Sequence, residues 1–138
     1  MPTTGSATYS GVVYGAGYYG GTQHDASLSG TSAFNVNFGT SAASLVLSLT
    51  ATDKTPSAAY SLGDVTMTGA LGNSCPGGCR ASFGLNSFAG GTTGNASGAF
   101  FGPQAAEFGA AFDFMIPAGD GQATHTSIFA GVTVGKKN

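Results

Sequence analysis

Apolar and polar side chains alternate along most of this sequence, and the alternation favours extended strands over helices. It is clearest over residues 43–51, where Leu45, Leu47 and Leu49 fall on one face and small hydroxyl residues on the other. A period of two residues is typical of a strand with one buried face. No segment carries a sustained helical period, and each of the 24 glycines would destabilise a helix by about 1 kcal/mol relative to alanine.

Turn residues divide the chain into eight extended segments with short connections. We expect strands over residues 8–14, 26–38, 43–51, 59–68, 80–88, 95–101, 108–115 and 126–134. Eight antiparallel strands are enough to close a barrel whose interior is filled by side chains, and closure removes exposed strand edges. The sequence therefore predicts an all-β fold, an eight-stranded antiparallel up-and-down β-barrel with a filled apolar interior. A β-sandwich is the alternative, because periodicity does not report closure.

Charged residues make up only 7% of the chain, against about 25% in ordinary soluble domains. Four basic residues cannot build the positive stripe that contacts phosphates, so we expect no nucleic-acid partner. No run of about 18 apolar residues is present, so no membrane-spanning helix is expected.

The length of 138 residues suits a single domain, either whole or a fragment of a longer surface protein. The first residues lack the charged and apolar regions of a signal peptide. The low charge and the many Ser, Thr and Gly residues are common in secreted and outer-surface bacterial proteins. We therefore expect a surface or secreted protein whose leader sequence is absent from this chain, with a cytosolic protein as the alternative.

The two cysteines, Cys75 and Cys79, flank a Pro-Gly-Gly turn. A disulfide across three residues is sterically allowed where glycines relax the loop. A zinc site would need about four ligands, and the redox motif is one residue shorter than this spacing. We expect a disulfide that pins the loop, which would imply an oxidising compartment, with free thiols as the alternative.

The two histidines, His24 and His125, are candidate ligands for haem or a metal ion. Both fall in predicted turns, where an exposed histidine without a ligand is the ordinary alternative. No Ser-His-Asp order with a nucleophile elbow, no paired carboxylates and no phosphate-binding loop are recognisable. We therefore expect no enzymatic activity, no metal site and no cofactor, with haem as the one cofactor still open.

Three tyrosines, Tyr14, Tyr18 and Tyr19, fall in or beside the first predicted loop, over residues 15–24. Exposed tyrosines next to glycines make good contact groups at interfaces. They are therefore candidate partner-binding residues, and packing of the rings over the barrel mouth is the alternative.

Residues 98–115 carry the most distinctive pattern in the chain. One strand ends at Gly102-Pro103, residues 104–107 are long enough for a single helical turn, and a second strand resumes by Gly109. Backbone geometry explains the two glycines and the proline. We expect Glu107 to accept hydrogen bonds from backbone amides of the connector or of a neighbouring strand.

This strand, Gly-Pro, turn, Glu, Gly, strand arrangement resembles the signature of the transferrin-binding-protein-B-like β-barrel domain. Residues 9–11, 30–38 and 129–136 resemble the opening, second and closing strands of the same family, in the same order. The resemblance implies an eight-stranded barrel at the Gram-negative outer surface, often as one domain of a lipoprotein. It transfers no binding residue, because partner contacts in known members lie on variable loops and an adjoining domain.

The resemblance thus implies a non-enzymatic cell-surface binding module. Its partner would be a host protein such as an iron carrier, or haem, in keeping with iron acquisition. The alternative is a structural subunit of a surface layer or filament, because few charges mean little repulsion between self-associating copies.

Overall fold

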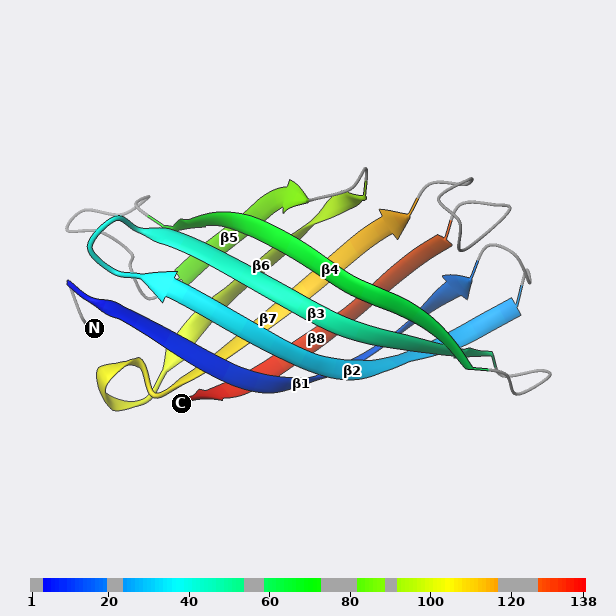
Figure 1. The fold of residues 1–138 in the computed structure, drawn as a ribbon, viewed down its shortest axis with the longest axis horizontal. Coiled ribbons are helices and arrows are strands. Elements are labelled where there is room, and N and C mark those ends of the chain that lie inside the picture. Colours follow the sequence, from blue (N-terminus) through cyan, green and yellow to red (C-terminus); the bar gives the residue numbers. More distant parts are fainter. Residues whose placement is uncertain (1–3, 20–23, 54–58, 73–81, 89–91, 117–126) are drawn as a thin grey trace.

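Eight antiparallel strands form a closed barrel in the computed structural model, which describes residues 4–19, 24–53, 59–72, 82–88, 92–116 and 127–138 (Figure 1). Each strand pairs with the next one along the chain, and β1 pairs with β8. The predicted up-and-down barrel is therefore confirmed, and the sandwich alternative is wrong. The strands are β1 (Ser6–Tyr19), β2 (His24–Asn37), β3 (Ala42–Asp53), β4 (Ala59–Leu71), β5 (Ser82–Phe88), β6 (Thr93–Phe101), β7 (Glu107–Ile116) and β8 (Ser127–Lys137).

The β1–β8 pairing is the seam that closes the barrel. Its register runs without a break from Tyr9 opposite Lys137 to Tyr18 opposite Ile128. At the end of β8, the amide of Asn138 donates to the carbonyl of Thr8 over 2.8 Å. The first and last strands are thus paired along ten consecutive positions.

The interior is filled by side chains from every strand. Phe34 lies at its centre, and its ring centroid is 4.6 to 5.8 Å from those of Tyr9, Phe83, Phe100 and Phe108. A second aromatic group links Phe112, Phe114 and Phe129, with centroids 5.6 to 5.9 Å apart. The predicted inward face of the third strand is confirmed, since Leu45, Leu47 and Leu49 are buried.

Glycines on the inner side of the seam make room for these rings. A Cβ atom at Gly135 would lie 2.5 Å from Cε1 of Phe108 and 2.6 Å from the carbonyl oxygen of Ser10. A Cβ at Gly131 would lie 2.9 Å from Cζ of Phe112. Ordinary van der Waals contact between carbons needs about 3.5 Å or more. These positions therefore exclude any side chain unless the seam or the rings move.

Three polar side chains inside the barrel are all hydrogen-bonded. The Tyr9 hydroxyl donates to the carbonyl of Ala105 over 2.7 Å, and burial raises the pKa of this phenol. Thr133 Oγ1 donates to the carbonyl of Val12 over 2.9 Å, so the 2.7 Å bond to Ser32 has the serine as donor. In the described part of the chain no buried side-chain nitrogen or oxygen lacks a partner.

The strands extend further than the sequence indicated at the first hairpin. Residues 15–19 continue β1, and β2 already begins at His24, so most of the predicted loop is strand. Gly15 and Gly17 continue the inward-facing positions of Tyr9 and Val13, where a Cβ atom would meet the backbone of β8. These glycines serve close approach of the two strands rather than a turn.

The connector between β6 and β7 is a single 3₁₀ turn, η1 (Pro103–Ala105). The predicted helical turn beginning at Pro103 is therefore present, although Gln104 and Ala105 both have φ of 55° and do not continue as a regular helix. Gly102 has φ of 78°, the left-handed region that favours glycine.

Replacing Gly135 by alanine tests the packing of the seam. We expect Gly135→Ala to lower the free energy of unfolding by about 1–3 kcal/mol, because the added methyl overpacks a rigid contact. Gly84→Ala is the matched control, since a Cβ there would meet nothing within 4 Å. Urea denaturation followed by circular dichroism measures both, and equal stabilities would contradict the packing argument.

Replacing Thr133 by valine tests the buried hydroxyl pair. Thr133→Val keeps the side-chain shape but leaves the buried Ser32 hydroxyl without its acceptor, so we expect a loss of about 1–3 kcal/mol in the free energy of unfolding. The double variant Ser32→Ala/Thr133→Val should lose less than the sum of the two single changes. Additive losses in urea titrations would show that the two hydroxyls do not act together.

Candidate binding surfaces

The outer side of the barrel is divided into two faces of opposite character. The outward side chains of β2, β3 and β4 are mostly Ser, Thr and Asn, and we call this surface the polar face. The outward side chains of β7, β8 and β1 are mostly Val, Ile, Ala and Tyr, and we call this surface the apolar face. Because the interior is filled, a partner has these outer surfaces to contact.

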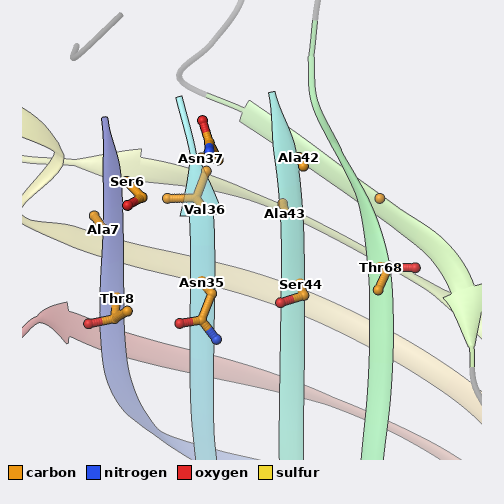
Figure 2. A pocket seen from close by; sticks show the side chains of 11 residues that line it. Ser6, Ala7, Thr8, Asn35, Val36, Asn37, Ala42, Ala43, Ser44 and Thr68 are labelled. Carbon is orange, nitrogen blue, oxygen red and sulfur yellow. The ribbon is translucent and has the colours of Figure 1, made fainter. Parts of the chain in front are cut away.

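A groove of about 500 Å³ lies at one end of the polar face. Figure 2 shows that its residues come from the ends of four neighbouring strands, β1 to β4. Strand register places one residue from each strand in a single transverse row: Thr8, Asn35, Ser44 and Thr68. Adjacent members of such a row are spaced by the strand separation of about 4.8 Å.

The hydrogen-bonding groups of this row are largely free. In the described part of the chain the side chains of Asn35, Ser44 and Thr68 make no hydrogen bond, whereas Thr8 Oγ1 accepts one from Asn138 Nδ2 over 3.2 Å. Asn37, one step closer to the rim, is occupied: its Oδ1 accepts from the amides of residues 39 and 40 over 2.9 and 3.0 Å. The row therefore offers an amide and two hydroxyls to a ligand.

None of the residues that line this groove is charged, and none is a histidine or cysteine. The groove therefore has no group suited to general acid–base or nucleophilic chemistry near neutral pH. Neutral amides and hydroxyls can both donate and accept, which suits recognition of uncharged polar groups such as peptide backbone. The arrangement suits hydrogen bonding to a polar partner.

Seven of the eight exposed large apolar side chains in the described residues lie on the apolar face, and the eighth, Phe101, lies beside it at the end of β6. Those identified in the described residues all project outward from β1, β6, β7 and β8: Val12, Tyr14, Tyr18, Phe101, Met115, Ile128, Val132 and Val134. A second groove, of about 480 Å³, crosses this face between Phe101 and Val12. Its floor includes glycines of three strands, Gly11, Gly109 and Gly135.

Two of the predicted partner-binding residues, Tyr14 and Tyr18, project from this face and are 64% and 56% exposed. The third tyrosine, Tyr19, pairs with His24 at the end of the β1–β2 hairpin, and their side chains lie outside what the structure describes. His125, Cys75 and Cys79 also lie outside the described residues, so the haem or metal ligands and the disulfide stay predictions.

The predicted motif residues lie in and beside the β6–β7 connector. Pro103 opens η1, and Gly109 lies two residues into β7. Glu107 begins β7, is exposed, and faces Lys136 across the β7–β8 ladder. Its expected hydrogen bond to backbone amides is not present among the described residues. The connector instead accepts hydrogen bonds from the buried Tyr9 hydroxyl, at the carbonyl of Ala105, and from Lys137, at the carbonyls of Gln104 and Ala106.

Sequence reasoning missed both the polar row and the extent of the apolar face. One signal for the apolar face was present, because Ile128, Val132 and Val134 fall on the face opposite to the buried Phe129. In a closed barrel one side of each strand faces the core. Apolar residues on the other side of the strand therefore indicate a contact outside the barrel. No comparable signal marks Asn35, Ser44 and Thr68, which become neighbours only through strand register.

Among the residues that the structure describes, no group of three or more His, Cys, Asp or Glu side chains is placed to hold a metal ion. No helix there is long and apolar enough to cross a membrane.

Comparison with known proteins places this geometry in a family. No curated protein matches the sequence. A protein family described as the C-lobe and N-lobe beta barrels of Tf-binding protein B matches residues 1–137. The match spans almost the whole chain and agrees with the closed eight-stranded barrel. The chain therefore belongs to the family of C-lobe and N-lobe β-barrels of transferrin-binding protein B.

Proposed function

We propose that this chain is a non-enzymatic binding module of the Gram-negative cell surface, and that its partner is an iron-carrier protein of the transferrin class. The observation that carries the proposal is the family match over residues 1–137, because the family is named for transferrin-binding protein B. The uncharged, catalytically inert groove on the polar face supports a binding role rather than an enzymatic one.

The filled interior supports binding on the outside of the barrel. Phe34 and the rings around it occupy the space that a hollow barrel would offer to a small ligand. The barrel then acts as a rigid scaffold that presents surface residues to a partner. A protein partner suits such a scaffold better than haem, for which His24 and His125 are the candidate ligands.

The polar row is the surface that we assign to the iron carrier. Asn35, Ser44 and Thr68 present unpaired donors and acceptors from three adjacent strands of a rigid sheet. Such groups form direct and water-bridged hydrogen bonds to a partner's backbone and side chains. Because the groove has no charge, binding through it depends on geometry more than on long-range attraction.

The same family membership supports cell-surface display. We propose that the natural protein is exported and exposed on the outer membrane as a lipoprotein. Protease treatment of intact bacteria that express the complete gene should digest this domain, whereas a periplasmic marker should survive. Protection of the domain in intact cells would contradict surface display.

Replacing the polar row tests the proposed binding site. We expect the immobilised protein to bind serum transferrin in biolayer interferometry, and Asn35→Ala/Ser44→Ala/Thr68→Val to weaken the affinity at least about tenfold. Each lost hydrogen bond contributes about 0.5–1.5 kcal/mol, and 1.4 kcal/mol corresponds to a factor of ten. Iron-loaded and iron-free transferrin are compared in parallel.

The control is Ser29→Ala/Thr31→Val/Thr50→Val, which removes three exposed or half-exposed hydroxyls of β2 and β3 outside the groove. Unchanged binding in this control together with the loss above locates the site. No binding of either form of transferrin by the wild-type chain would contradict the assignment of the partner. Equal losses in both variants would contradict the assignment of the groove.

A further inference from the structure

The apolar face exposes a large apolar area for a monomeric surface. Seven large side chains on it, and Phe101 beside it on β6, are between 41% and 64% exposed. With about 150–250 Å² for a whole aromatic side chain and about 60–120 Å² for an aliphatic one, their exposed area amounts to roughly 400–700 Å². The largest apolar patch on a typical monomer is about 300–600 Å², and each partner in a standard protein interface buries about 800 Å², of which about 56–65% is apolar. The face therefore matches the apolar share of one side of a standard interface.

The register of the seam arranges this face in transverse rows that cross β8 and β1. From one end of the barrel to the other, the outward pairs are Lys136 with Ser10, Val134 with Val12, Val132 with Tyr14, Ala130 with Ala16, and Ile128 with Tyr18. The central row is Val132 with Tyr14. On one side of it both strands carry valine, and on the other side both strands carry alanine.

The order of side-chain sizes along this face makes the face complementary to the same face of a second copy. Consider a two-fold axis that lies in the interface, runs across the strands and passes through the central row. This axis places each strand opposite the same strand of the second copy, and the two run antiparallel. The valine row of one copy then meets the alanine row of the other, so large side chains fill the space above small ones. The outer rows exchange as well, so that Tyr18 faces Ser10, and Lys136 faces Ile128 at the edge of the contact.

We propose that the apolar face is the interface between two copies of this chain, which form a two-fold symmetric dimer. Val132 and Tyr14 of the two copies meet at the axis, and Val12 and Val134 pack over Ala16 and Ala130 of the second copy. Identical surfaces that match in this way give a closed, isologous dimer. The two outer sheets then pack face to face as aligned sheets do, about 10 Å apart.

The charges on this face are compatible with such a contact. Glu107 and Lys136 are neighbours across the β7–β8 ladder at one end of the face. Asp113, on the outer side of β7, comes opposite Gly109 of the second copy, where no side chain competes for space. No charged residue falls in the valine, central or alanine rows of β8 and β1, and Asp113 of β7, beside Ala130, is the one charge in the alanine row. The two seam strands therefore form an uncharged centre of the contact, with Asp113 to one side of it.

A second copy is the occupant that these observations select. Binding to a different protein or to a lipid surface would need only an apolar face. It would not require a valine row and an alanine row placed symmetrically about a central row. A closed barrel also has no free strand edge through which copies could join. The dimer uses a surface other than the polar row, so it stands or falls separately from the proposed transferrin binding.

Sedimentation velocity of the full chain over a range of concentrations tests the proposal. We expect a reversible dimer, and a dissociation constant at least about 100-fold higher for Val132→Lys, because two like charges would meet at the axis. Val46→Lys is the matched control, since Val46 projects outward from β3 on the polar face and should leave the dimer unchanged. Circular dichroism checks that both variants keep the fold.

A swap of row sizes tests the two-fold geometry itself. Ala130→Val should weaken the dimer by crowding Val134 of the second copy, and the double variant Ala130→Val/Val134→Ala should restore it. A wild-type chain that stays monomeric would overturn the proposal, as would assemblies that grow beyond a dimer with concentration. The proposal would also be overturned if the wild-type chain were a monomer that binds transferrin or vesicles and the Val132→Lys variant lost that binding. The apolar face would then be the binding surface for that partner.

Discussion

The closing pairing of β1 with β8 is the constraint on which the rest of the structure depends. It can form only where the backbones approach each other over aromatic rings, and glycines at Gly131 and Gly135 permit that approach. The rings that these glycines accommodate, Phe108 and Phe112, are part of the same packed interior as Phe34. Closure and core packing are therefore one requirement, since a barrel held open at this seam would leave the rings exposed to water.

A filled and closed barrel leaves its outer surface as the place for function. The inward residues are mostly apolar on every strand, so they do not distinguish one side of the barrel from another. The outward residues do distinguish them, because polar side chains follow β2 to β4 and apolar side chains follow β7, β8 and β1. Because the polar face and the apolar face lie on different sides of the barrel, one small domain can contact two partners independently.

Period-two alternation was enough to predict the strands and the inward faces, as Leu45, Leu47 and Leu49 show. It failed at residues 15–19, because Gly15 and Gly17 are as compatible with a turn as with the crowded inner side of a seam. It also could not reveal the rows on either outer face. Asn35 and Ser44, or Val134 and Val12, become neighbours through strand register, which depends on the closed barrel rather than on any local pattern.

The choice of side chains on the outer faces has a reason beyond strand propensity. Valine, isoleucine and threonine are all β-branched and all favour extended backbone. On the polar face this preference is met mainly by threonine, as at Thr31, Thr50 and Thr66. On β8 it is met by Ile128, Val132 and Val134, which expose methyl groups to water where hydroxyls would support the strand equally well. Because strand formation does not require this difference, a contact that removes those methyl groups from water accounts for it.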